Sequence, residues 1–150
     1  MKKERIRIMI VDDHQMVRET WKTLLQIHDI FEIIGECDNG TEAIEMSRAL
    51  KPDIILMDIN MYPVNGFDAT REIIQFFPEA RIIGLSVNDQ PVYARKLLQL
   101  GARGYVTKHS TSEEMAIAIH EVIKGNTYIC REIKKKMGED LTSEDGKSIL

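Results

Sequence analysis

Two groups of acidic side chains each follow directly after a short apolar run. Asp12 and Asp13 come after four consecutive apolar residues, and Asp58 comes after another four. Carboxylates that lie close together raise one another's pKa unless a cation neutralises them. A set of oxygen ligands with room for water suits Mg²⁺. If the fold brings these three side chains together, they predict a Mg²⁺ site, with the backbone carbonyl of Asn60 as a further ligand.

A hydroxyl and an ammonium group follow two later apolar runs. Ser86 lies near the end of the run that starts at Ile82, and Lys108 comes directly after Tyr105-Val106-Thr107. An ammonium group pairs with anions and a hydroxyl donates a hydrogen bond to them, so both side chains suit a phosphoryl group. Each residue alone also fits a turn or a solvated position. Ser86 and Lys108 indicate a phosphoryl-binding site only if the fold places them beside the carboxylates.

Short apolar runs predict the strands that must position these side chains. Two of the runs are continuously apolar instead of alternating, which is typical of strands covered on both faces, as in a parallel sheet. The five predicted strands are Ile6–Val11, Ile33–Cys37, Ile54–Met57, Arg81–Val87 and Gly104–Thr107.

Apolar residues at helical spacing follow each of these strands, within 17–25, 43–50, 70–77, 94–101 and 115–122. This alternation predicts an α/β fold, a flavodoxin-like doubly wound (βα)5 with a five-stranded parallel sheet of strand order 2-1-3-4-5. Ligands bind such sheets at the carboxyl ends of strands 1 and 3. Those ends carry Asp12, Asp13 and Asp58, and helix capping by single aspartates does not explain all three.

The composition narrows the class of protein. The chain has 150 residues, 43% of them hydrophobic, and a net charge of −4, which predicts one domain whose core needs no cofactor. Concentrated Lys and Arg are needed to bind phosphate backbones, so the bulk of this acidic chain is not expected to bind DNA. Cys37 and Cys130 have no second Cys or His at metal-ligand spacing, which predicts free thiols in a reducing compartment. Since no apolar run is long enough for a signal peptide or a membrane span, we expect a cytoplasmic protein without membrane contact.

Several separated motifs occur in an order that resembles the response regulator receiver domain. They are Val11-Asp12-Asp13-His14, Asp58-Ile59-Asn60-Met61, Asn65-Gly66, Ser86, and Tyr105 with Lys108. The resemblance covers roughly residues 5 to 125. The run from Gly101 to Lys108 is most similar to the NarL/FixJ-like group.

The resemblance implies a role for each matching residue. Asp58 is the expected phosphoacceptor, Asp12 and Asp13 the Mg²⁺-binding pair, Ser86 the switch hydroxyl, Tyr105 the switch aromatic and Lys108 the phosphoryl-binding lysine. It further implies that a sensor histidine kinase donates the phosphoryl group and that phosphorylation promotes a homodimer. The expected output face is formed by the fourth helix, fifth strand and fifth helix. Such a protein assists its own phosphorylation and dephosphorylation but is not otherwise an enzyme.

Two positions depart from the family pattern. Tyr62 stands where many receivers have proline, and Pro63 follows it. His109 follows Lys108 where many receivers have proline, so a cis Lys-Pro bond is impossible. The first departure concerns the turn after the acceptor strand, and the second concerns how Lys108 is presented.

Other classes of protein remain as alternatives. A haloacid-dehalogenase-like aspartyl phosphotransferase also uses a nucleophilic Asp on a parallel sheet, but it needs a second Asp at the position of Asn60. A flavodoxin needs a phosphate loop after the first strand, where Asp12 and Asp13 would repel phosphate. A receiver-like interaction module independent of phosphorylation is the third alternative, and the complete acidic set argues against it.

The end of the chain predicts a separate segment. We expect residues 1–127 to form the receiver and residues 128–150 a linker or tail. Arg131, Lys134, Lys135 and Lys136 make a basic stretch that fits a solvated linker. The run from Leu141 to Leu150 has a faint similarity to the start of a LuxR-type helix-turn-helix. Because this group normally carries such a domain, we expect DNA contact only through an output domain that is truncated or absent in this chain.

Overall fold

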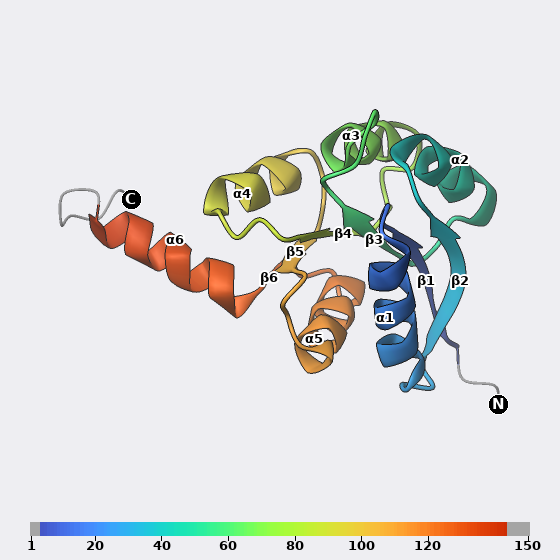
Figure 1. Cartoon of the computed structure of the whole chain (residues 1–150), viewed down its shortest axis with the longest axis horizontal. Helices are drawn as coiled ribbons and strands as arrows, with labels where there is room; N and C mark the ends of the chain where they lie inside the picture. Colours follow the sequence, from blue (N-terminus) through green and yellow to red (C-terminus); the bar gives the residue numbers. More distant parts are fainter. Residues whose placement is uncertain (1–3, 144–150) are drawn as a thin grey trace.

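The chain alternates strands and helices throughout the part that the computed structural model describes, residues 4–143 (Figure 1). The strands are β1 (Ile6–Val11), β2 (Phe31–Cys37), β3 (Ile54–Asp58), β4 (Ile82–Ser86), β5 (Gly104–Thr107) and β6 (Tyr128–Ile129). The helices are α1 (Gln15–Gln26), α2 (Gly40–Leu50), α3 (Gly66–Phe76), α4 (Pro91–Gln99), α5 (Ser112–Ile123) and α6 (Arg131–Ser143).

All strands belong to one parallel sheet with the order β2-β1-β3-β4-β5-β6. The predicted α/β fold and the order of its first five strands are therefore confirmed. The sixth strand was not predicted. It has two residues, too few to show a hydrophobic period, and it extends the β5 edge through the bond that Cys130 N donates to Tyr105 O (3.0 Å).

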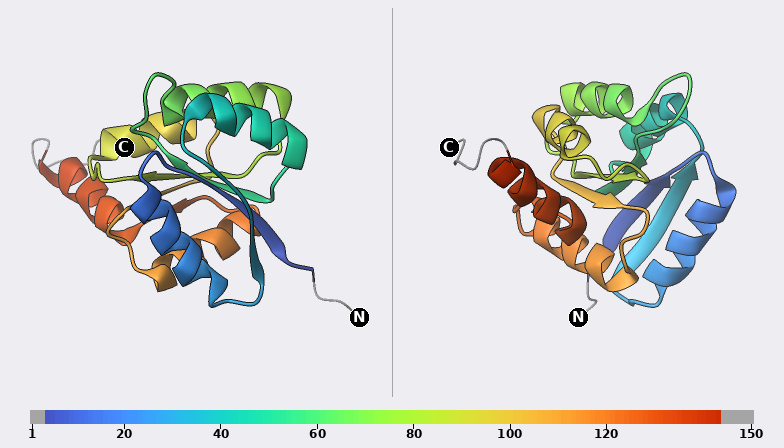
Figure 2. Two further views of the ribbon diagram at one scale, coloured as in Figure 1. Left: turned by 45° about the vertical axis from the view of Figure 1, so that its right-hand side comes forward. Right: turned by 60° about the vertical axis from the view of Figure 1, so that its left-hand side comes forward.

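Helices cover both faces of the sheet, with α1 and α5 on one side and α2, α3 and α4 on the other (Figures 1 and 2). The central strands are consequently enclosed. Ile8–Val11 of β1 and Ile54–Met57 of β3 are fully buried, which accounts for their continuous apolar sequence. Burying each such side chain stabilises the fold by about 1.5–3 kcal/mol relative to exposure, so these two strands form a firm base for the residues that follow them.

Helix α5 begins at a Thr-x-x-Glu sequence with the spacing of a capping box, of which only half forms. Thr111 Oγ1 accepts a hydrogen bond from Glu114 N (3.0 Å). The Glu114 carboxylate does not return to the cap. Its Oε2 accepts instead from the Tyr128 hydroxyl and from Arg131 N, both at 2.8 Å. Glu114 thus holds the C-terminal segment against α5.

The segment predicted to be a linker or tail contains β6 and α6. Cys130 and Ile133 are fully buried in the core, and α6 lies beside α4 (Figures 1 and 2). The basic stretch from Arg131 to Lys136 therefore lies within a helix that packs against the core. Residues 144–150, which belong to the run similar to a LuxR-type domain, lie outside the described residues. The boundary at residue 127 and the linker role stay predictions. No helix within residues 4–143 is both long and apolar enough to cross a bilayer.

Candidate functional site

The ends of β1 and β3 bring the acidic side chains together. The two strands are adjacent and parallel, with Val11 paired to Met57, so Asp12 and Asp58 follow at the same edge of the sheet. Single ligand atoms from Asp12, Asp13, Asp58 and the neighbouring His14 all lie within 4.8 Å of one another. The convergence expected from the strand order is thus present.

Asp12 and Asp58 are fully buried, and one carboxylate oxygen of each accepts a hydrogen bond from a backbone N–H. Asp12 Oδ1 accepts from His14 N (2.8 Å), and Asp58 Oδ1 accepts from Asn60 N (3.0 Å). Within the described part of the chain, neither Oδ2 accepts a hydrogen bond. Buried oxygens in this condition are costly unless a cation or a ligand compensates them.

Lys108 supplies one positive charge to this pocket. Its Nζ lies 2.7 Å from Asp12 Oδ2 and 3.5 Å from Asp58 Oδ2, making ion pairs without an aligned hydrogen bond. One ammonium faces three carboxylates, so the pocket keeps an excess of negative charge. The donor set, carboxylates with nearby backbone oxygen, is the kind that Mg²⁺ prefers. The described residues therefore fit a divalent cation.

The environment of Asp58 shifts its acidity. Burial is the main cause and raises the pKa of Asp58 to about 6, with the charge of Asp12 acting in the same direction. The Asn60 N–H and the Lys108 ammonium oppose the shift. At neutral pH the carboxylate is thus mainly ionised, as a nucleophile must be, and it is only weakly solvated.

Ser86 and Tyr105 both form hydrogen bonds with the backbone of Asn88. Ser86 is fully buried, and its Oγ accepts from Asn88 N (2.9 Å) and from Asn60 Nδ2 (3.3 Å). The Tyr105 hydroxyl donates to Asn88 O (3.0 Å), and burial raises the pKa of Tyr105 to about 12. The Tyr105 ring is fully buried in this structure. A switch at this residue would act through the Asn88 loop.

The response regulator receiver domain matches residues 8–120 of the chain. The chain belongs to this family.

Relatives of the receiver agree with this assignment. It is 39% identical over 125 residues to the transcriptional regulatory protein DegU of Brevibacillus brevis, covering 83% of this chain and 53% of DegU. It is 36% identical over 132 residues to the response regulator GacA of Pseudomonas viridiflava, covering 88% of this chain and 62% of GacA. The chain thus spans between half and two thirds of the length of these relatives.

A solved structure shows the same architecture. The crystal structure of a two-component response regulator of the LuxR family from Aurantimonas sp. SI85-9A1 matches the receiver with a TM-score of 0.88 and 33% identity. The match covers 91% of this chain and 98% of that one. The fold is therefore that of a response regulator receiver.

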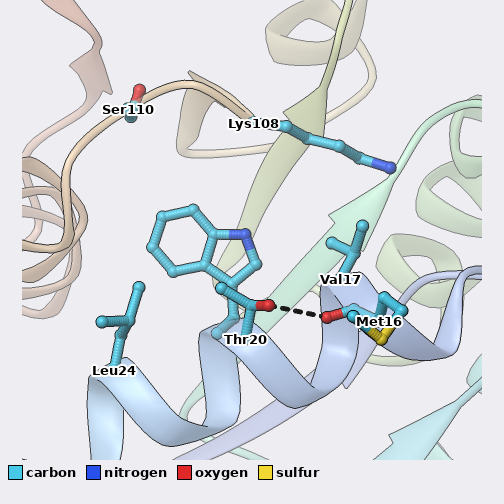
Figure 3. Close-up of a pocket in the computed structure, with 7 residues that line it drawn as sticks. Met16, Val17, Thr20, Leu24, Lys108 and Ser110 are labelled. Carbon is cyan, nitrogen blue, oxygen red and sulfur yellow. Dashed lines mark hydrogen bonds between the residues drawn. The ribbon is translucent and has the colours of Figure 1, made fainter.

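The two departures from the family pattern leave the pocket of the receiver intact. Lys108 N donates to Ser86 O (2.8 Å), which continues the β4–β5 ladder and aims Lys108 without a following proline. Figure 3 shows the Lys108 side chain extending above α1, where it lines one pocket with Val17 and Trp21. Tyr62 is 90% exposed, so its ring projects from the loop after β3 into solvent.

Two residues of the matching motifs, to which the sequence analysis gave no role of their own, shape the receiver pocket. His14 Nδ1 lies 2.9 Å from Asp13 Oδ1 and 3.2 Å from Asp12 Oδ1, and its position beside the acidic pair was the available signal. Gly66 permits a close approach of the following loop to the end of β3. A Cβ atom at Gly66 would clash with the Asp58 carbonyl oxygen, so a side chain there would displace the backbone of Asp58.

Proposed function

We propose that this chain is the phosphorylation-dependent receiver of a two-component response regulator and that Asp58 accepts a phosphoryl group from a sensor histidine kinase. The observation that carries the proposal is the buried Oδ2 of Asp58. This oxygen accepts no hydrogen bond from the described residues and lies 3.5 Å from Lys108 Nζ. A nucleophile and a cation for the incoming group therefore share one pocket.

Phosphoryl transfer depends mainly on alignment of the nucleophile with the phosphorus and on positive charge near the phosphoryl oxygens, so the protein has little covalent chemistry to perform. Asp58 Oδ2 attacks phosphorus, the bond from phosphorus to the kinase histidine nitrogen breaks, and the imidazole leaves. Lys108 and Ser86 bind phosphoryl oxygens as negative charge moves onto them. Asp12, Asp13, Asp58 and the Asn60 carbonyl would hold Mg²⁺, which when bound supplies positive charge to the carboxylate and phosphoryl oxygens.

The product is an acyl phosphate that water can hydrolyse. Asn60 and Asn88 flank Ser86 and are placed to set how readily attacking water enters. The chain then acts as a phosphoacceptor that turns itself over slowly, in keeping with the signalling role of its family. Exchanging both Asn60 and Asn88 for alanine should change the rate of dephosphorylation, and an unchanged rate would remove this role.

The output of the receiver is proposed to pass through α4, β5 and α5. Tyr105 on β5 contacts the Asn88 loop that leads into α4. The transcriptional regulatory protein DegU is longer than this chain, which covers 53% of its length. We therefore propose that residues 128–150 lead toward a DNA-binding output domain and that phosphorylation promotes a homodimer. A cytoplasmic location fits this role.

The alternatives receive less support from the site. A haloacid-dehalogenase-like mechanism needs a general acid two residues after the nucleophile, and Asn60 cannot donate a proton in that way. A module that works only through protein contact gives no reason for buried carboxylate oxygens without hydrogen bonds at Asp12 and Asp58.

Labelling with acetyl phosphate and Mg²⁺ tests the proposal. Intact-protein mass spectrometry should show the addition of one phosphoryl group to the wild-type chain and none to Asp58→Asn. Asp38→Asn is the matched control, because Asp38 follows the neighbouring strand β2 but is exposed outside the pocket. Equal labelling of Asp58→Asn and the wild type would overturn the assignment of Asp58.

A further inference from the structure

Helix α6 contacts both loops that carry the phosphoryl-binding residues of the pocket. One contact reaches the end of β5, next to Lys108, and the other reaches the loop after β4, next to Ser86. Neither contact belongs to the acidic pocket itself. Together they connect the last described helix to the two side chains expected to bind the phosphoryl oxygens.

The first contact joins Glu132 to the end of β5. Thr107 Oγ1 donates to Glu132 Oε1 at 3.0 Å, and it lies 3.4 Å from the Ser110 hydroxyl. Thr107 is fully buried and directly precedes Lys108. Hydrogen bonds to a charged acceptor are stronger than those between neutral groups. Glu132 thus fixes the orientation of Thr107 and of the peptide that leads to Lys108.

The second contact joins Lys136 to the loop after β4. Lys136 Nζ donates a short hydrogen bond to Asp89 Oδ2. Asp89 follows Asn88, which donates to Ser86 Oγ through its N–H and accepts from the Tyr105 hydroxyl through its carbonyl. A continuous set of bonds therefore runs from α6 through this loop to Ser86.

The start of α6 is fixed independently of these two contacts. Ile133 is fully buried in the core, Cys130 N donates to Tyr105 O, and Arg131 N donates to Glu114 Oε2. The helix is thereby held by β5 and α5. An element anchored in this way can hold the two loops in place, because its own position does not depend on them.

We propose that Glu132 and Lys136 are positioning residues through which α6 pre-organises the loops of Lys108 and Ser86 for the phosphoryl group on Asp58. This proposal rests on the proposed function. Linkage makes the effect reciprocal: if α6 contacts favour the phosphoryl-bound arrangement, the phosphoryl group must favour α6 contacts to the same degree. Phosphorylation would then be sensed at α6, and so by whatever follows it in the chain.

Binding of beryllofluoride, a phosphoryl mimic, tests the proposal in the full chain with Mg²⁺ present. Glu132→Ala and Lys136→Met should each weaken beryllofluoride binding by about 3- to 10-fold, the range of single charge-assisted bonds. Glu132→Gln keeps an acceptor oxygen for Thr107 and should retain most of the affinity. Lys135→Met is the matched control, because Lys135 is an exposed lysine of the same helix, and its affinity should equal that of the wild type.

Hydrogen exchange of the α6 amides provides a second readout that a merely structural role would not move. Beryllofluoride should slow exchange within residues 131–138 of the wild-type chain, and Lys136→Met should reduce that slowing. If Lys136→Met proves unstable, Asp89→Asn removes the same ion pair from the other side. Unchanged or tighter binding in both Glu132→Ala and Lys136→Met would overturn the role of α6.

The outcomes separate this proposal from the proposed function. If the wild-type chain fails to bind beryllofluoride, or Asp58→Asn binds it equally well, the phosphoacceptor assignment itself fails. If the wild type binds it in an Asp58-dependent way while the α6 variants match Lys135→Met, only the positioning role fails.

Discussion

The ammonium of Lys108 lies 2.7 Å from Asp12 Oδ2, across the edge of the sheet from β1 to β5. The same ammonium lies 3.5 Å from Asp58 Oδ2. Because Asp12 and Asp58 are fully buried, their charges depend on this cation to a degree that surface carboxylates do not. Stability, metal binding and phosphoryl binding should consequently be coupled in this pocket.

Removal of Lys108 should destabilise the metal-free protein. Lys108→Met leaves buried carboxylates without their ion-pair partner, which we expect to lower the free energy of unfolding by about 2–4 kcal/mol. Mg²⁺ should restore part of this loss, since it supplies positive charge to the same oxygens. Urea unfolding with and without Mg²⁺ measures both effects. A loss no greater than that of Lys135→Met would contradict the ion-pair argument.

Asp58 should make the stability of the metal-free protein depend on pH. Its pKa in the fold is about 6 and its ordinary value is 3.8. Because the folded pKa is the higher one, the favourable contribution of the protonated carboxyl is complete below about pH 4 and is lost as pH rises through about 6. Relative to Asp58→Asn, which does not titrate, the wild type should lose up to about 3 kcal/mol across this window. Unfolding of both proteins in parallel pH series checks this, and a constant difference would refute it.

Much of the pocket could be predicted because sheet topology determines it. Continuously apolar runs identified β1 and β3, and parallel neighbours place Asp12 and Asp58 at one edge. These steps need only the type and period of residues along the chain. The position of Lys108 followed in the same way from the end of β5.

Contacts between side chains distant in sequence could not be predicted. The bond between Thr107 and Glu132 depends on where α6 lies, and β6, which leads into α6, is too short to leave a periodic signal. The inward position of the Tyr105 ring likewise depends on space beside Gly84. Such features depend on how different helices and strands pack together, and the spacing of residues along one element does not predict them.

Mg²⁺ binding should alter the fluorescence of Trp21, the single tryptophan of the chain. Trp21 is buried and lines one pocket with Lys108 (Figure 3). A cation on the carboxylates competes with the Lys108 ammonium, so the environment of the indole should change as Mg²⁺ saturates. Asp13→Asn removes a proposed ligand and should weaken the apparent affinity about 10-fold or more, whereas Asp38→Asn should not. Equal affinities in these two variants would exclude Asp13 from the metal site.

Gly84 on β4 should resist substitution because the Tyr105 ring and Leu97 of α4 occupy the space beside it. A Cβ atom there would lie 3.0 Å from Tyr105 Cδ2, and its approach to Leu97 Cδ2 is closer still. Gly84→Ala should therefore lower the free energy of unfolding by about 1–3 kcal/mol through overpacking. Gly138→Ala is the control, because a Cβ at Gly138 meets no atom within 4 Å and alanine favours the helix by about 1 kcal/mol. If Gly84→Ala is as stable as the wild type, the ring of Tyr105 is not confined against β4, and a switch through its hydroxyl and Asn88 loses its structural basis.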